Sequence, residues 1–286
     1  MTSPVVLITG GTRGLGANLA LRFWNEGFSV AISARQELDI QNVFKAFPHR
    51  SGQRTFSFPC DMAITSEVEK FIQRIKQECP SLKVLINNAA IQGPIGPLSR
   101  NDFSLWQQTI QVNLLAPVAL CQGLIPFMKK TTNGGSIINL SGGGATGPRA
   151  NFSAYATAKA GLVRLSETLA EELKPDGIRV NCIAPGAMKT AMLEEVLTNG
   201  QAAAGEKEFS IANKVFEEGG ASMDRVADLL VFLASDQSKG ITGKLISAVW
   251  DDWEHWPDHL EQLSSSDVYT LRRIAGRDRG FAWGDK

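Results

Sequence analysis

A tyrosine and a lysine four residues apart, Tyr155 and Lys159, are the residues of this chain best suited to proton transfer. They lie in a helix-compatible stretch, where positions i and i+4 fall on the same face and their side chains are neighbours. A free phenol has a pKa of about 10, so it exchanges protons poorly near neutral pH. A neighbouring ammonium favours the phenolate and lowers that pKa, so the spacing predicts an acid or base at Tyr155. The same spacing also occurs by chance on solvent-exposed helix faces. The pair alone therefore does not establish a catalytic role.

A glycine-rich segment near the N-terminus predicts a site for a phosphorylated ligand. The apolar run 5–9 is typical of a buried parallel strand, the glycine-rich run 10–16 follows it, and a helix-compatible stretch spans 17–26. In this order the glycines let the backbone approach a pyrophosphate, and the helix N-terminus offers free N–H groups. The spacing is G-x-x-x-G-x-G rather than the usual dinucleotide fingerprint, and a purely structural turn is the alternative.

The composition narrows the class of protein. The chain has 286 residues, 43% of them hydrophobic, and a net charge of zero, which suits one large α/β domain and gives no reason to expect nucleic acid as a partner. The four cysteines are far apart and there are only three histidines, which favours a reducing compartment and no metal site. We find no apolar run of the about 18 residues that a membrane span needs. The expected location is the cytoplasm, away from membranes.

Strand-like and helix-like segments alternate along the chain. Repeated units of this kind predict a doubly wound parallel sheet with helices on both faces, in three layers α/β/α. The expected strands are 5–9, 29–33, 55–58, 84–87, 136–140 and 178–183, and the expected helices include 36–47, 65–78, a long helical region 101–129, and 153–174.

Candidate functional residues follow the predicted strands. Ligands of such sheets bind at the carboxyl ends of the strands, so groups that follow different strands are expected to meet there. Besides the glycine-rich run, these groups are Arg35, Asp61, Asn88, Ser141 and Pro185-Gly186.

Five motifs together resemble one known family. They are the run T-G-G-T-R-G-L-G at 9–16, N-N-A-A at 87–90, Asn113 in a helix, the Tyr155–Lys159 pair, and Pro185-Gly186. Through them the chain resembles the short-chain dehydrogenase/reductase family, in its compact single-domain branch, over about residues 4–247. The resemblance implies a Rossmann fold, hydride transfer between a nicotinamide cofactor and a carbonyl or alcohol carbon of a small molecule, and a homodimer or homotetramer.

The resemblance also implies roles for individual residues. Tyr155 would give or take the proton, and Lys159 would lower the pKa of Tyr155 and bind the nicotinamide ribose. Asn113 would hold a water of the proton relay through its backbone, with a helix kink or packing role as the alternative. The residues expected to bind the cofactor are Gly10, Thr12, Arg13, Gly14, Leu15, Gly16, Arg35, Asp61, Asn88, Tyr155, Lys159, Pro185, Gly186 and Thr190.

The catalytic serine is where the chain departs from the family pattern. That serine usually lies thirteen residues before the tyrosine, and this position is Gly142 here, one residue after Ser141. In a regular strand Ser141 would point to the opposite side from position 142. The following glycines could let the backbone rearrange so that Ser141 reaches the site and binds the substrate oxygen. Alternatively the substrate oxygen is bound by Ser153, by Thr146 or by glycine N–H groups, or the protein catalyses the reaction only weakly.

The cofactor is expected to be NADP(H) rather than NAD(H). Relatives that prefer NAD usually carry an acid after the second strand, and here that place is Arg35. Arg13 lies in the glycine turn, and two guanidinium groups suit a ribose 2′-phosphate. Asp61 is expected to contact the adenine, with ordinary helix capping as the alternative.

We divide the chain into a dinucleotide-binding and catalytic domain, 1–247, and a C-terminal extension, 248–286. Residues 187–222 are expected to form a flap over the substrate. Four of the six tryptophans lie in the extension, which should pack on the substrate mouth or across a subunit interface. Its arginines are expected to pair with its own acids, or else to meet an anionic substrate. The leading function is an NADP(H)-dependent carbonyl reductase or alcohol dehydrogenase. The alternative, suggested by Gly142, is a cofactor-binding sensor or partner subunit with little catalysis.

Overall fold

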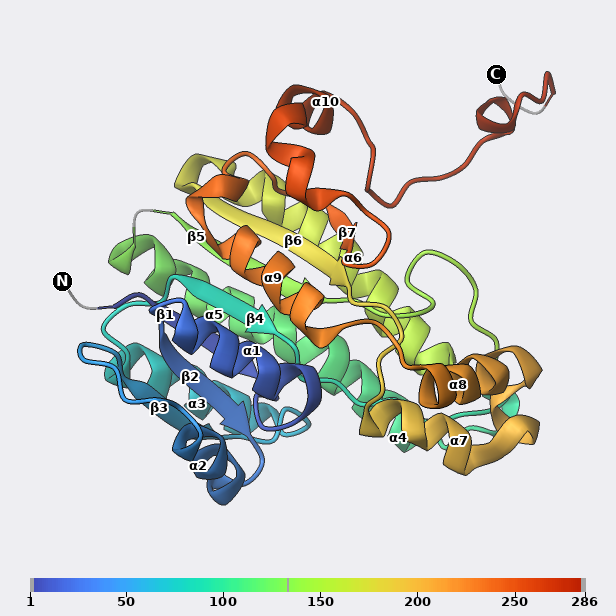
Figure 1. The fold of residues 1–286 in the computed structure, drawn as a ribbon. Helices are drawn as coiled ribbons and strands as arrows, with labels where there is room; N and C mark the ends of the chain where they lie inside the picture. Colours follow the sequence, from blue (N-terminus) through green and yellow to red (C-terminus); the bar gives the residue numbers. More distant parts are fainter. Residues whose placement is uncertain (1–2, 133, 284–286) are drawn as a thin grey trace.

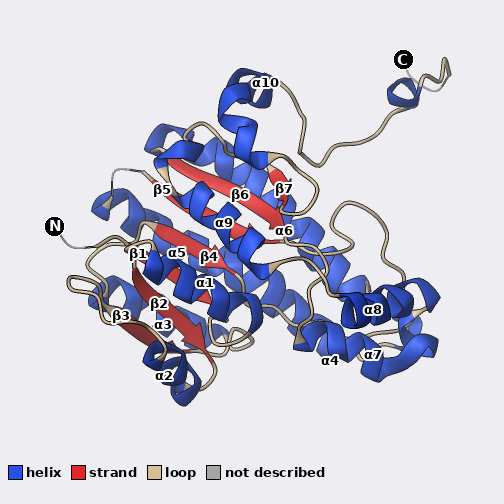
Figure 2. Ribbon diagram, in the orientation of Figure 1, coloured by secondary structure: helices blue, strands red, loops and turns tan. Residues whose placement is uncertain are grey.

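The computed structural model describes residues 3–132 and 134–283, which form one parallel sheet covered by helices on both faces (Figures 1 and 2). The strand order is β3-β2-β1-β4-β5-β6-β7, and every pairing is parallel. This confirms the predicted doubly wound α/β fold. The strands are β1 (Val5–Thr9), β2 (Ser29–Ala34), β3 (Thr55–Pro59), β4 (Val84–Asn87), β5 (Gly135–Leu140), β6 (Ile178–Ala184) and β7 (Leu245–Ser247).

Strand β1 shows why these sequences form a central sheet. Its five residues are buried, and side chains alternate between the two faces. Val6 and Ile8 belong to one hydrophobic cluster, the first core, and Val5 and Leu7 to another, the second core. Each strand of this kind therefore supplies apolar side chains to two helical layers at once.

The helices divide between these two cores. Helices α1 (Gly14–Asn25) and α9 (Met223–Ala234) pack into the first core, and α3 (Thr65–Glu78) and α5 (Ala116–Thr131) pack into the second. The other helices are α2 (Glu37–Lys45), α4 (Phe103–Ile110), α6 (Ser153–Leu173), α7 (Ala191–Ala204), α8 (Glu206–Glu218) and α10 (Leu260–Ser265). Helices α7 and α8 form most of the predicted flap and lie together beyond the carboxyl ends of the strands (Figure 1).

The predicted long helix 101–129 is interrupted in the structure. A π-helical turn, Gln111–Leu115, separates α4 from α5. Among the described residues, one helical segment, Phe103–Thr131, is long and apolar enough to cross a membrane by length and composition alone. Here it is a core helix, because Leu120, Leu124 and Met128 are buried in the second core. The π turn matters for function because it carries Asn113.

The C-terminal extension begins as part of the body and ends outside it. Trp253, Trp256 and Leu263 are buried in the first core. Beyond α10, the chain runs past the edge strand β7, where the Leu245 N–H donates to the carbonyl of Tyr269 over 2.8 Å. The last described residues then lead away from the sheet (Figure 1). Phe281 and Trp283 stack on each other there and are exposed.

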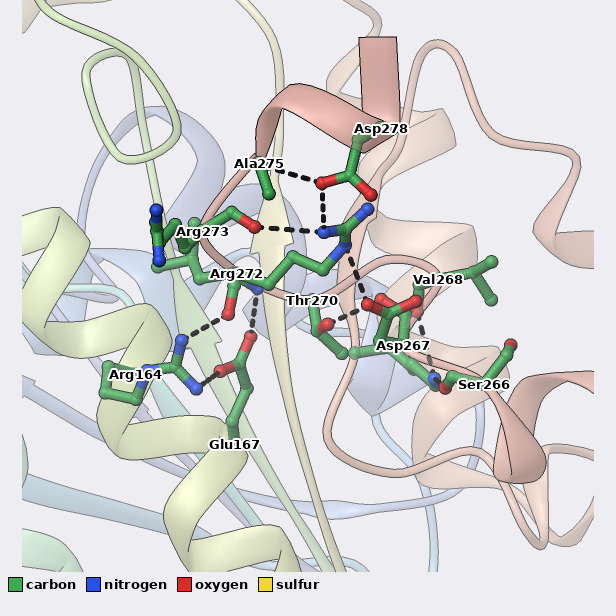
Figure 3. A network of polar contacts seen from close by, with 12 residues as sticks. Arg164, Glu167, Ser266, Asp267, Val268, Thr270, Arg272, Arg273, Ala275 and Asp278 are labelled. Atoms are coloured by element: carbon green, nitrogen blue, oxygen red, sulfur yellow. Dashed lines mark hydrogen bonds and ion pairs between the residues drawn. The ribbon is translucent and has the colours of Figure 1, made fainter. Parts of the chain in front are cut away.

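Polar contacts fasten the middle of the extension (Figure 3). The Lys244 ammonium donates to the carbonyls of Ser266 and Val268, over 3.4 and 3.0 Å. Arg272 pairs with Asp267 and Asp278, over 2.7 and 2.8 Å, so the expectation that its arginines pair with its own acids is confirmed for Arg272. The described polar contacts of residues 266–278 with the body are made to α6 and the β7 edge, and a role over the substrate mouth or in a subunit interface stays a prediction.

Candidate active site

The glycine-rich turn forms an open cradle at the N-terminus of α1. Gly10 and Gly14 have φ of +64° and +51°, in the region that favours glycine. A Cβ on Gly16 would lie 2.1 Å from the carbonyl oxygen of Gly10, so a side chain does not fit there. The N-cap residue, Arg13, makes no side-chain hydrogen bond to the helix. The first N–H groups of this 12-residue helix therefore suit a phosphate.

Asn88 and Thr9 hold this cradle against the end of β4. The Asn88 side-chain amide donates to the carbonyls of Thr9 and Gly10, over 2.9 and 3.1 Å. The Thr9 hydroxyl accepts from the N–H groups of Asn88 and Ala89, each over 3.0 Å. The asparagine predicted to bind the cofactor thus shapes the turn that would bind it.

A pocket of about 380 Å³ lies beside the cradle, where an adenosine ribose would follow the pyrophosphate. It is lined by Thr12, Arg13, Asp39, Asn42 and Val43. Arg13 and Arg35 are both exposed, and within the described residues neither guanidinium has an ion-pair partner. Of the two arginines, Arg13 lines the pocket together with Asp39.

Asp61 makes a local turn. Its carboxylate accepts from the Ala63 N–H over 2.9 Å, and its own N–H donates to Glu67 over 2.7 Å. One carboxylate oxygen of Asp61 is therefore used in local capping, the alternative role. Contact of Asp61 with an adenine stays a prediction.

Tyr155 and Lys159 lie buried on one face of α6. Their residues are 6% and 2% exposed. The Lys159 ammonium lies 5.5 Å from the centre of the Tyr155 ring and donates to the carbonyl of Leu140, at the end of β5, over 2.7 Å. The predicted pair is therefore formed at the carboxyl end of the sheet.

The electrostatics of this pair differ from the prediction. Burial raises the pKa of Tyr155, and the cation that opposes this increase is Arg149. Burial also lowers the pKa of Lys159 to about 8, so this amine carries less of its charge than an exposed lysine does. The predicted lowering of the Tyr155 pKa is therefore not found, because burial disfavours the charged form of both side chains.

Asn113 joins the π turn to the loop after β4. Its side chain accepts from the N–H of Ile91 over 2.9 Å and donates to the carbonyl of Ile91 over 2.8 Å. It is 1% exposed. The side chain is thus committed to a structural role, and a water of a proton relay would be held by the backbone, as the resemblance implies.

Gly142, and not a serine, lies against the Tyr155 hydroxyl. A Cβ built on Gly142 would be 2.3 Å from the phenol oxygen. Ser141 donates its N–H to Ile183, as strand pairing requires, over 2.7 Å. Its buried hydroxyl has no hydrogen-bond partner within the described residues.

Cys182 is a buried thiol near Ser141. Burial raises the pKa of the Cys182 thiol to about 12, and Lys159, Ser166 and Ser141 oppose this increase. A role of Ser141 in binding the substrate oxygen stays a prediction. Of the alternatives, Ser153 accepts from the indole N–H of Trp106 over 3.2 Å, and Thr146 is exposed.

Arg149 is a site residue that the sequence analysis missed. It lies in the loop between β5 and α6, with its guanidinium 3.9 Å from the centre of the Phe152 ring and 5.6 Å from that of Tyr155. Its Nε donates to Glu208 of α8 over 2.8 Å. The sequence gives no signal that an arginine in this loop lies beside Tyr155, because its ion-pair partner, Glu208, is 59 residues away.

The loop after β6 brings the flap to the glycine turn. Gly186 has a φ of +85°, and a Cβ there would lie 2.8 Å from Ala221 and from Val249. Thr190 lies next to the cradle, since its methyl group would be 3.6 Å from a Cβ on Gly14. Thr190 therefore borders the glycine-rich turn, and cofactor binding by Pro185, Gly186 and Thr190 stays a prediction. In the described residues, no cluster of three His, Cys, Asp or Glu side chains could hold a metal ion.

A family model described as short chain dehydrogenase matches residues 4–201. The chain belongs to this family. An uncharacterised oxidoreductase of Bacillus subtilis is 31% identical over 250 residues, which cover 87% of this chain and 90% of that protein. A 3β-hydroxysteroid dehydrogenase of Eggerthella lenta is 33% identical over 243 residues, 85% of this chain and 91% of that protein.

Solved short-chain dehydrogenases have the same fold. One from Shigella flexneri, in complex with NADP, is 26% identical, with a TM-score of 0.74 over 87% of this chain and 98% of that one. One from Escherichia coli, in complex with NADPH, has the same identity, TM-score and coverage. These comparisons confirm the predicted family and fold, and they place the protein in a family of oxidoreductases that act on small molecules.

Proposed function

We propose that the protein is an NADP(H)-dependent oxidoreductase that reduces a carbonyl to an alcohol or catalyses the reverse reaction. The observation that carries this proposal is the buried Tyr155–Lys159 pair at the end of β5, with the amine 5.5 Å from the centre of the phenol ring. Burying two ionisable side chains costs free energy, and short-chain dehydrogenases use this pair for proton transfer.

The chemistry follows from where charge develops. A bound NADPH supplies a hydride, which carries two electrons to the carbonyl carbon, and is left as NADP⁺. The π electron pair of the carbonyl moves to oxygen, and the Tyr155 hydroxyl gives this oxygen its proton. Tyr155 then recovers a proton from water, so that carbonyl, NADPH and H⁺ become alcohol and NADP⁺. Lys159, held by the carbonyl of Leu140, is the cation beside the phenolate that forms.

The preference for NADP(H) rests on Arg13 and Arg35. Neither guanidinium has an ion-pair partner among the described residues, Arg13 lines the pocket beside the glycine-rich turn, and Arg35 directly follows β2. The NADP and NADPH complexes of two structural neighbours support this choice. We expect tighter binding of NADPH than of NADH, and equal dissociation constants for the two would contradict the role of the arginines.

A second candidate function is a cofactor-binding sensor or partner subunit with little catalysis. One observation favours it: Gly142 stands where the family pattern has its catalytic serine. This candidate shares the cofactor site but predicts no turnover.

Homo-oligomer formation and a cytoplasmic location remain part of the proposal. Phe103 and Leu105 of α4 and Leu115 of the π turn are exposed apolar side chains, and we propose them as contacts with a second copy. The four cysteines are buried and free, as suits a reducing compartment.

The test is a panel of carbonyl substrates with NADPH, with loss of NADPH absorbance as the readout. We expect turnover by the wild-type protein and a loss of at least about a hundredfold in Tyr155→Phe, because general acid–base catalysis contributes about 10²–10⁴-fold. Binding of NADPH, followed by its fluorescence, should be unchanged in the variant. Tight NADPH binding without turnover of any substrate would favour the second candidate.

A further inference from the structure

A nearly buried cation lies beside the phenol of Tyr155. The Arg149 side chain is 12% exposed and its partner in α8, Glu208, is 19% exposed. The guanidinium covers the ring of Phe152 at 3.9 Å and lies 5.6 Å from the centre of the Tyr155 ring. Burying a charge is costly unless it is paired, so Glu208 explains why Arg149 can stay here. It does not explain what the rest of the guanidinium does.

The terminal amino groups of Arg149 are available. Its Nε is used by Glu208, over 2.8 Å. Within residues 3–132 and 134–283, its two Nη groups make no hydrogen bond. A guanidinium has five N–H donors in a fixed plane, so four of them remain for another acceptor.

These donors lie next to the place where a serine is missing. Gly142 lies against the Tyr155 hydroxyl, and a Cβ on Gly143 would be 3.6 Å from the Nε and 3.7 Å from the Cζ of Arg149. The guanidinium therefore lies next to Gly143, the residue that follows Gly142. The serine at the end of this strand is Ser141, which is buried and lies one residue before the position that faces the phenol.

We propose that Arg149 is a catalytic residue, whose Nη groups donate hydrogen bonds to the substrate oxygen in place of the hydroxyl that position 142 lacks. The proposal rests on the proposed function, carbonyl reduction with Tyr155 as acid. As the hydride reaches the carbon, negative charge gathers on this oxygen, and a fixed cation in a site shielded from water stabilises it. Glu208 is a positioning residue that holds Nε and so fixes the plane of the guanidinium.

The same cation acts on the phenol. The charged groups near Tyr155 are Arg149 and Lys159, and Glu208 is in turn paired with Arg149. Arg149 opposes the increase in the pKa of Tyr155 that burial causes. Removing its charge is therefore expected to move the titration of Tyr155 to higher pH.

The experiment compares Arg149→Met with Glu208→Gln. Methionine keeps the apolar stem without the donors, and glutamine keeps an acceptor for Nε without the charge. If Arg149 binds the substrate oxygen, kcat should fall by about 10²–10³-fold in Arg149→Met, as for other oxyanion donors, and by less than about tenfold in Glu208→Gln. If the ion pair only fastens the loop to α8, the two variants should lose similar activity. Arg149→Lys should keep part of the rate, because it keeps a cation.

Two further readouts separate catalysis from structure. Guanidine added to Arg149→Gly should restore activity if the missing donors are the cause, and should not if the loop is misplaced. In protein labelled with ¹³C at the tyrosine Cζ, Tyr155 is one of two signals, and it should titrate at higher pH in Arg149→Met than in wild type. This second readout needs neither cofactor nor substrate.

The outcomes also separate this inference from the proposed function. Turnover by the wild type, its loss in Tyr155→Phe, and a less than threefold effect of Arg149→Met on kcat would overturn the role of Arg149 alone. If the wild type reduces none of the carbonyl panel, the proposed function fails and the role of Arg149 fails with it.

Discussion

At the scale of single residues, Gly142 determines how much room the Tyr155 hydroxyl has. A Cβ at position 142 would lie 2.3 Å from the phenol oxygen, which is shorter than any real contact, so either the strand end or the ring has to move. We predict that Gly142→Ala lowers kcat by about a hundredfold or more, because a displacement of about 1 Å can cost this much. Steady-state kinetics with NADPH and a carbonyl substrate measure it.

Gly147 is the matched control for this substitution. It lies in the same loop, with no atom within 4 Å of an added Cβ. Gly147→Ala should keep kcat within threefold of wild type, and both variants should bind NADPH as wild type does. Full activity of Gly142→Ala would show that the Tyr155 hydroxyl does not work where the structure has it.

Lys159 gives the stability of the protein a defined pH dependence. Burial lowers its pKa in the folded state from 10.5 to about 8. Between these values the unfolded chain binds more protons, so the free energy of unfolding rises with pH in this window. Cys182 and Tyr155 have raised pKa values, so their contributions to the free energy of unfolding change in the opposite direction toward the upper end of the window. The wild type and Lys159→Met share both groups, so the difference between the two proteins reports on Lys159.

We therefore expect the wild type to gain about 1–2 kcal/mol relative to Lys159→Met between pH 7.5 and pH 9.5. Urea denaturation of both proteins at each pH measures this difference. A constant difference across the window would mean that Lys159 is not desolvated. Enzymatic activity plays no part in this measurement, so it tests the burial of the amine by itself.

The residues of the site differ in how far their places could be predicted. Tyr155 and Lys159 are neighbours on one helix, and periodicity alone brings them together. Arg149 and its partner Glu208 come from different elements, and only the folded flap brings them together. The prediction that the Tyr155 pKa is lowered was wrong, because burial raises this pKa more than the nearby cation Arg149 lowers it. Burial depends on the tertiary structure and is not visible in the local sequence.

At the scale of elements, the side chain of Asn113 joins the π turn in the helical segment 103–131 to the loop after β4. Asn113 pairs with both backbone groups of Ile91, over 2.9 and 2.8 Å. Asn113→Ala should lower the free energy of unfolding by about 2–4 kcal/mol, because two buried backbone groups would lose their partners. Denaturant unfolding of the variant tests this, with the exposed Asn42→Ala as control, for which we expect a change within about 0.5 kcal/mol.

The strands could be predicted closely because their sequences are short apolar runs between glycines, prolines and charged residues. Predicted and observed bounds of β1 and β4 are the same, and β2, β3, β5 and β6 differ by one residue. The break between α4 and α5 was not predictable from this pattern. Both halves have helical sequences, and the π turn depends on the contact of Asn113 with a loop 22 residues earlier.

At the scale of the whole molecule, the C-terminal extension has two parts with different roles. The part through α10 contributes Trp253, Trp256 and Leu263 to the first core. The part beyond Arg272 leads away from the sheet and carries the exposed pair Phe281 and Trp283 (Figure 1). The aromatic content of the extension indicated that it would pack against the rest of the molecule. It could not indicate where, because the partners of the extension lie on α9 and along β7.

Two truncations separate these parts. Ending the chain after Arg273 removes no buried side chain among the described residues, and it breaks the pairing of Arg272 with Asp278, an ion pair of small value near the surface. We expect a change in Tm of less than about 2 °C, since about 1 kcal/mol shifts the Tm of a protein of this size by about 2–4 °C.

Ending the chain after Trp250 removes three buried apolar side chains, each worth about 1.5–3 kcal/mol. This second truncation should lower Tm by more than about 10 °C or leave the protein insoluble. Differential scanning calorimetry measures both, and equal Tm values for the two truncated chains would mean that the buried tryptophans do not hold the first core together.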